Sequence, residues 1–326
     1  MTSHHESEPE SASERIPRGS SRPKRAKTGG VVPCKDRRFS AACCGELQWK
    51  APPLACDSHF HVFGPAERYP YGTDLRYKPP VAPLADFLAL SRRLGFERWV
   101  FVQPSAYGRD NTCMLDAMCE LPGSRGIVDV HEDIPDAELA ALDAAGVRGV
   151  RINVRPIKPP DPGFGATLLP RIERLDARCA EIGWILDFLM PGWLTEELMG
   201  TLSRLKADFM LAHMGMFLAR DGVNQRGFRQ MLDLLRHGEG RCWVKLTGLY
   251  RMSTAPGFAD AGPMMQALVE TSPERLIWGS DYPHLSFADK AGTVELFNFL
   301  GRWVPDEANR RKILVDNPQH LFKLGQ

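Results

Sequence analysis

The sequence predicts a single-domain (β/α)8 barrel, the TIM-barrel architecture, and three observations support this fold class. From residue 55 onward, short apolar runs alternate with amphipathic stretches, which is the pattern of repeated βα units. Eight such runs occupy about 270 residues, close to the ~250 residues usual for this barrel. No run is followed by a GxGxxG or GxxxxGK[ST] signature, which would favour the alternative of an open, doubly wound sheet.

The predicted strands are short apolar runs. Four of them, VFVQ, GVRIN, WILDFL and LIWGS, are nearly continuous in apolar residues, as is typical of parallel strands that are covered on both faces. In chain order the eight strands are expected at 55–62, 99–103, 126–130, 149–154, 184–189, 209–213, 243–247 and 276–280.

The segments between these strands predict helices, because their apolar residues recur at i, i+3 and i+4. Three of the segments end at Gly95, Gly146 and Gly183, and glycine commonly ends a helix because it adopts a positive φ without strain. The clearest helical segments are 83–95, 136–146, 168–183 and 195–205.

Two connections, 63–82 and 155–166, are longer than a minimal barrel needs. Both follow the C-terminal end of a predicted strand, and barrel enzymes build their sites on that face. We therefore expect these loops to contribute to a site, although plain surface excursions are the alternative.

The N-terminal tail, residues 1–50, is predicted to be disordered and basic, and to precede a barrel domain at 51–326. It carries ten Lys or Arg and six Asp or Glu residues, and it has too few apolar residues to offset the entropy of ordering the chain. The run RPKRAK at 22–27 leaves open a non-enzymatic function, in which the tail binds polyanions.

The composition argues against several classes of protein. The formal net charge is +1, so no overall field attracts nucleic acid or a membrane surface, and no apolar run reaches the ~18 residues of a membrane span. The eight cysteines include no CxxC pair, and no apolar signal-peptide core is visible. We expect a cytoplasmic protein with reduced thiols and no nucleic-acid or membrane partner, and its oligomeric state stays open.

Residues that can carry chemistry stand at three predicted strand ends. His59 and His61 are two residues apart on the first strand, so their side chains point to the same side. His213 ends the sixth strand, and Asp281 follows the eighth at a turn. Each alone also suits a structural role, but the C-terminal ends of barrel strands meet at one mouth. Together they predict one site, where imidazoles can hold a metal and a carboxylate can act as a general base.

Arg151 lies within a predicted strand that otherwise reads as core. Because an unpaired buried charge costs on the order of several kcal/mol, we expect Arg151 to have an anionic partner. That partner is either a substrate carboxylate, which suits the two parallel hydrogen bonds of a guanidinium, or an aspartate of the scaffold.

Beyond residue 55 the chain resembles the amidohydrolase superfamily, and within it the lactonase branch. The resemblance implies a TIM-barrel hydrolase that opens a carboxylated lactone of the pyrone-dicarboxylate or muconolactone type. It rests on motifs in the order of the family: CDSHFHVFGP at 56–65, LRYKPP at 75–80, VFVQPSAYGRDN at 100–111, RGVRINV at 148–154, AHMG at 212–215, VKLTGLYR at 244–251, IWGSDYPH at 277–284 and DNPQHLF at 316–322.

The resemblance also implies roles for individual residues. Asp281 would activate the attacking water as general base. His59, His61 and His213 would polarise the lactone carbonyl, directly or through a metal. The positions that bind the substrate, a small anionic lactone, would be Arg151, Arg251, Tyr77, Ser105 and His284.

The cofactor expected from this resemblance is one divalent metal, with zinc favoured, or none. Members of the superfamily that bind two metals carry a bridging Lys or Glu on the fourth strand and a further histidine, which this sequence lacks, so we expect no two-metal site. Leu189 and Met216 stand where the branch has Tyr and Arg, so the substrate is expected to differ from the branch's dicarboxylate. The ligands of a single metal would be His59, His61, His213 and Asp281.

A metal-dependent decarboxylase of an aromatic or muconate-type acid is the alternative among enzymes. Such relatives also combine an HxH pair, a later histidine and the acid of a G-[ST]-D-Y-P motif. The segments VFGP and VQPSAYGRDN favour the lactonase branch.

Overall fold

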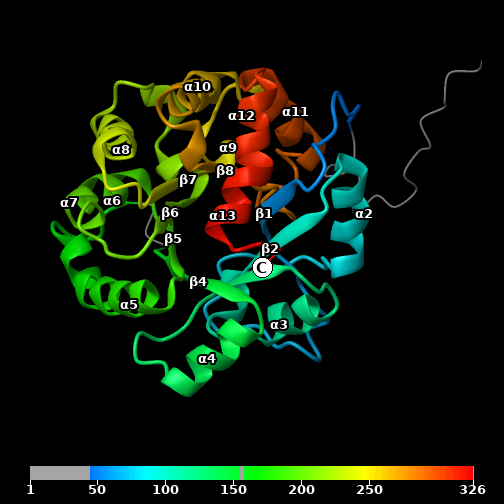
Figure 1. Cartoon of the computed structure of the whole chain (residues 1–326), viewed down its shortest axis with the longest axis vertical. Helices are drawn as coiled ribbons and strands as arrows, with labels where there is room; N and C mark the ends of the chain where they lie inside the picture. The colour runs from blue at the N-terminus through cyan, green and yellow to red at the C-terminus, as the bar shows by residue number, and fades with distance from the viewer. Residues whose placement is uncertain (1–44, 155–157, 326) are drawn as a thin grey trace, which may run out of the picture. The chain divides into compact units, whose positions relative to one another are not determined.

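The computed structural model describes residues 45–154 and 158–325, which form an eight-stranded barrel with helices outside it (Figure 1). Neighbouring strands pair in parallel in the order β1 to β8, which confirms the predicted (β/α)8 fold. Each strand lies within two residues of its predicted bounds. The strands are β1 Cys56–Phe60, β2 Arg98–Val102, β3 Arg125–Val128, β4 Val147–Asn153, β5 Ile185–Leu189, β6 Phe209–Leu211, β7 Cys242–Leu246 and β8 Leu276–Trp278.

The helices follow the strands as βα repeats require. Gly95 and Gly183 end their helices with φ of 96° and 69°, as predicted. The segment predicted as one helix at 195–205 is two short helices instead, because the backbone leaves helical geometry at Leu198. The α-helices are α2 Leu84–Leu94, α3 Thr112–Cys119, α4 Asp136–Ala144, α5 Leu169–Ile182, α6 Gly192–Glu197, α7 Met199–Leu202, α8 Arg226–His237, α9 Leu249–Met252, α10 Gly262–Thr271, α11 Thr293–Trp303, α12 Glu307–Arg311 and α13 Asn317–Leu321.

The barrel closes through residues that follow β8. The backbone N–H of Asp281 donates to the carbonyl of His59 at 2.8 Å, and the N–H of His61 donates to the carbonyl of Tyr282 at 2.9 Å. Tyr282 also forms a parallel bridge with Phe60. The residues that close the barrel are therefore the same residues that carry its predicted chemistry.

The lower half of the barrel interior is an apolar core closed by the C-terminal segment. Alternate strand residues point inward and pack together with Phe322 and its neighbours. Arg125 fixes that segment from β3 by donating to the carbonyls of Phe322 and Lys323 at 3.2 and 2.7 Å. The buried residues of this inner core are Cys56, Val100, Val102, Ile127, Ile185, Met210, Trp243, Ile277, Leu321, Phe322 and Leu324.

The two ends of the loop 63–82 lie side by side, because the N–H of Phe63 donates to the carbonyl of Ala82 at 2.9 Å. It carries Arg76 and Tyr77 to the cavity described below, as predicted for a loop that contributes to a site. The other long loop, 155–166, is described only from Lys158 onward, and that part does not line the cavity.

Residues 1–44, which include most of the predicted tail and its basic run, lie outside the described residues. Trp49, just before the predicted boundary at residue 50, packs on the barrel domain. Its indole stacks on Phe297 of α11 with ring centroids 4.0 Å apart and donates to the Phe297 carbonyl at 3.1 Å. Among the described residues, no helix is long and apolar enough to cross a membrane.

The closure of the inner core by Phe322 gives a prediction about stability. Phe322 is fully buried, so we expect Phe322→Ala to lower the free energy of unfolding by about 3–5 kcal/mol, measured by urea denaturation. Phe322→Leu, which keeps most of the buried volume, should cost clearly less. Equal denaturation midpoints for wild type and Phe322→Ala would show that the C-terminal segment does not close the core.

Candidate active site

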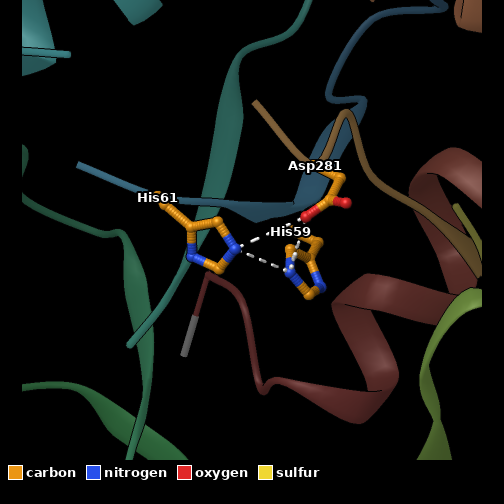
Figure 2. Close-up of side chains that lie close together, drawn as sticks. All are labelled: His59, His61 and Asp281. Carbon is orange, nitrogen blue, oxygen red and sulfur yellow. Dashed lines mark hydrogen bonds and ion pairs between the residues drawn. The ribbon is translucent and has the colours of Figure 1, made fainter. Parts of the chain in front are cut away.

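Three histidines and one aspartate meet above the apolar core, at the C-terminal ends of the strands. The Asp281 Oδ1 atom lies 3.3 Å from His59 Nε2 and 3.4 Å from His61 Nε2, and these two nitrogens are 3.3 Å apart (Figure 2). His213 Nε2 lies 3.7 Å from Asp281 Oδ2. All four side chains are buried. The structure thus brings together the four residues that the sequence singled out from three strand ends.

Two glycines permit this close approach. A Cβ atom on Gly279, just after β8, would lie 2.5 Å from the backbone nitrogen of His59, so only glycine lets the two chain segments come together here. Gly248 has a φ of +63°, and a Cβ there would lie 2.7 Å from Cγ of His213. His213 itself has a φ of 52°, in the short turn Ala212–Met216 that follows β6.

The second nitrogen of each imidazole has its own partner. His61 Nδ1 lies 2.8 Å from the carbonyl of Val102, so Nδ1 carries the proton and Nε2 presents its lone pair to the cluster. His213 Nδ1 is 2.7 Å from Thr247 Oγ1, and its Nε2 has no hydrogen-bond partner among the described residues. His59 Nδ1 is 2.9 Å from Lys245 Nζ.

Lys245 belongs to a buried charge network that the sequence reasoning missed. Its Nζ lies 3.4 Å from Asp187 Oδ1, and the other oxygen of Asp187 lies 3.8 Å from Arg151 Nε. Arg151 also donates to the carbonyl of Gln103 at 2.9 Å. Arg151 therefore has a scaffold partner in Asp187 and also lines the cavity, and its contact with a substrate carboxylate stays a prediction. The sequence did contain a signal for these two residues, because Lys245 and Asp187, like Arg151, are charged residues within apolar strands.

Asp281 is held from its far side by residues of α9. Its Oδ2 atom accepts a hydrogen bond from the Tyr250 hydroxyl and lies 3.4 Å from Nε and Nη2 of Arg251. Tyr250 was not predicted, because an apolar-looking tyrosine beside an arginine gives no sequence signal.

The surroundings keep Asp281 ionised and the histidines neutral at pH 7. Burial alone would raise the pKa of Asp281, but the nearby His213 and Arg251, together with the contacts that its Oδ1 atom makes with His59 and His61, outweigh burial and hold the pKa well below its usual value. Burial lowers the pKa of His59, His61 and His213. A carboxylate base thus faces imidazoles that carry no charge of their own.

The remaining buried charges leave the site positive. Lys245, Arg151 and Arg251 face the carboxylates of Asp187 and Asp281, and burial raises the pKa of the neighbouring Asp57 to about 7, so that it carries only part of a negative charge. Charge of one sign inside a cleft with low-dielectric walls attracts ligands of the opposite sign. The site is therefore suited to an anion.

A cavity of about 780 Å³ opens onto this cluster. His61, Arg151 and Arg251 line its inner part, together with Tyr77 and Ser105, whose hydroxyls lie 3.4 Å apart. His284 does not line the cavity. Its ring is fully buried and packs against the ring of Tyr250, with centroids 5.6 Å apart. Its Nε2 lies 3.3 Å from Thr293 Oγ1, so His284 is not placed to contact a substrate directly.

His59, His61 and Asp281 form a group that could hold a metal ion. Their three donor atoms are 3.3, 3.3 and 3.4 Å apart, and the edge of a tetrahedron around zinc, with bonds near 2.05 Å, is about 3.3 Å. The carbonyl partner of His61 is the kind that orients a metal-bound imidazole. For His59 to ligate through Nε2, its proton must move to Nδ1, and the Lys245 ammonium, now 2.9 Å from Nδ1, must turn toward Asp187 alone. The donor set therefore suits one tetrahedral cation.

Comparison with known proteins agrees with this architecture. The chain is 37% identical over 305 residues to 4-sulfomuconolactone hydrolase of Rhizobium radiobacter, covering 91% of this chain and 98% of the relative. It is 33% identical to 2-pyrone-4,6-dicarboxylate hydrolase of Comamonas testosteroni, covering 84% and 92%. A crystal structure from Pseudomonas putida, provisionally described as a 2-pyrone-4,6-dicarboxylic acid hydrolase, superposes with a TM-score of 0.73 at 32% identity, covering 84% and 98%.

The family model for amidohydrolases matches residues 56–324, which include all eight strands and every residue of the cluster. The chain therefore belongs to the amidohydrolase family.

Proposed function

We propose that the protein hydrolyses a lactone that carries a carboxylate, with Asp281 as general base. The observation that carries this proposal is the placement of an ionised, buried carboxylate beside neutral imidazoles, at the inner end of a cavity with two arginines. The relatives named as hydrolases of lactones, at 37% and 33% identity, support the same reaction.

The arginines position the substrate. Arg151 and Arg251 line the same part of the cavity and donate charge-assisted hydrogen bonds to the carboxylate, which directs the lactone carbonyl toward the histidines. Holding the substrate in one orientation makes the attack of water effectively intramolecular, which lowers the entropic cost of the reaction.

Asp281 then takes a proton from water, and the water oxygen forms a bond to the lactone carbonyl carbon. His213 stabilises the developing oxyanion: with Nδ1 accepting from Thr247 Oγ1, its Nε2 carries the proton and can donate it in a hydrogen bond. When the tetrahedral intermediate collapses, the ring C–O bond breaks, and the leaving oxygen takes the proton back from Asp281. The product is the open-chain hydroxy acid or its keto tautomer, and Asp281 is ionised again.

We infer that His59, His61 and Asp281 would hold one divalent cation, and that this cation is zinc, because their donor atoms lie 3.3–3.4 Å apart and zinc binds imidazole nitrogens and carboxylate oxygens. When bound, such a cation polarises a carbonyl and lowers the pKa of water to about 7. His213, with its unpartnered Nε2, is the candidate for a fourth interaction.

Decarboxylation of an aromatic or muconate-type acid is the competing reaction. The curated names of the more similar relatives favour lactone hydrolysis over it. A single assay separates the two, because decarboxylation releases CO2, whereas lactone opening releases one acid equivalent and no CO2.

Asp281→Asn tests the general base. Asparagine keeps the shape of the side chain but cannot take a proton, so we expect kcat to fall by about 10²–10⁴-fold while the far-ultraviolet circular dichroism is unchanged. Tyr250→Phe is the matched comparison: it removes the hydrogen bond to Asp281 but keeps the carboxylate, and should lose much less. Near-normal turnover in Asp281→Asn would eliminate this residue as the base.

Arg151→Gln tests the carboxylate contact. Loss of a charge-assisted hydrogen bond should raise KM for a carboxylated lactone by about 10- to 100-fold, with a much smaller effect on the methyl ester of the same lactone. The control is Arg171→Gln, because Arg171 pairs with Asp129 and Glu132 outside the cavity. An equal change in KM for acid and ester would contradict a direct contact between Arg151 and the carboxylate.

Elemental analysis of the protein after incubation with zinc and removal of the excess tests the cation site. We expect at most about one equivalent, and a loss of that zinc in His61→Ala. His131→Ala is the control, because His131 is half exposed and lies away from the cluster. Two bound equivalents would contradict a single site, and none would contradict zinc binding.

A further inference from the structure

The cavity extends well beyond the catalytic cluster. Its volume of about 780 Å³ lies in the upper part of the range of about 300–1,000 Å³ that is typical of pockets for drug-sized ligands. A compact monocyclic lactone that reaches His61, Arg151 and Arg251 fills only the inner part of such a space.

One side of the remaining space is apolar, and we call it the apolar wall. It comes from the end of β5, the turn into α6, the segment after the β6 turn, and the loop that follows Asp281. The residues of the apolar wall are Leu189, Met190, Trp193, Met216, Phe217, Leu218, Leu285 and Phe287.

The apolar wall is built by packing between elements. A Cβ on Gly192, in the turn into α6, would lie 2.8 Å from the carbonyl oxygen of Met216 and 3.0 Å from the Phe217 ring, so these two segments are in close contact. The Phe217 ring packs on Phe228 of α8, with centroids 6.0 Å apart. The wall therefore exists before any ligand binds, which lowers the cost of binding.

The cavity lining has a cationic part and an apolar part that meet at Phe287. The described cationic groups of the lining are Arg76, Arg151 and Arg251, and the Arg251 guanidinium lies 5.1 Å from the centroid of the Phe287 ring, so Phe287 marks the edge of the apolar wall. The polar residues that accompany the wall include the carboxylates of Glu196 and Asp221. They pair with Arg226 and Arg220, at 3.5 and 3.8 Å, and neither arginine is among the described residues of the lining, so this side offers no cation to a second anionic group of a substrate. The lining thus provides for an anion at one end and for an uncharged, apolar group at the other.

We propose that the substrate is an amphipathic lactone, with a carboxylate at the arginine end and an uncharged alkyl or aryl arm against the apolar wall. This proposal rests on the proposed lactone hydrolysis and narrows its substrate class. The arm excludes water from Leu189, Trp193 and Met216, and the apolar area that it buries contributes to binding.

A series of carboxylated lactones that differ only in an arm on the far side of the ring tests this proposal. With methyl, propyl and pentyl arms we expect kcat/KM to rise by about fourfold per added methylene until the wall is covered, as burial of a methylene predicts. An arm of equal length that ends in a carboxylate should be at least about tenfold poorer than its methyl-ended counterpart.

Leu218→Lys adds a readout that misfolding cannot imitate. Leu218 is partly exposed, so the lysine is tolerated, and its charge should shift the ratio of kcat/KM by at least about tenfold toward the carboxylate-ended arm. Val81→Lys is the matched control, because Val81 is exposed outside the cavity, and there the ratio should not change.

The outcomes separate the two proposals. If compact lactones are hydrolysed and kcat/KM stays level or falls as the arm grows, the amphipathic substrate is wrong and lactone hydrolysis stands. If no lactone of the series is opened, the proposed function itself is wrong.

Discussion

Several charged side chains are buried in the interior of this barrel, and the need to pair them determines the rest of the site. Buried charges are tolerated only with partners, so Asp187 bridges Lys245 and Arg151, while Asp281 faces three imidazoles and Arg251. The lower half of the barrel needs no such pairing, because it is apolar and closed by the C-terminal segment. The charged groups therefore lie at one end of the domain, where the excess of positive charge favours the binding of an anion.

The backbone joins closure of the barrel to assembly of the cluster of three histidines and Asp281. The same hydrogen bond that ties the segment after β8 to β1, from Asp281 to His59, also fixes the separation of the Asp281 carboxylate from the histidines. Gly279 is part of this arrangement, because a larger residue would push the two segments apart. A change that distorts the closure of the barrel therefore also changes the geometry of the cluster.

Much of this was accessible from the sequence, and for identifiable reasons. Strand periodicity put His59 and His61 on one side, and barrel topology brought His213 and Asp281 to the same mouth. A charge inside an apolar strand drew attention to Arg151, and the same rule applied to Lys245 and Asp187 would have found them. Tyr250 and the burial of His284 depend on how α9 and the loop after β8 pack, which no local pattern encodes. The partners that set each imidazole tautomer come from distant strands, so they too required coordinates.

The C-terminal closure of the inner core also bears on how the protein is made. The barrel interior contains side chains from β1 and from residues 321–324, so its lower layer joins nearly the first and the last parts of the domain to be synthesised. On a translating ribosome that layer stays open until residues 321–324 emerge, and during this interval the apolar faces of the nascent strands are accessible to chaperones or to other nascent chains.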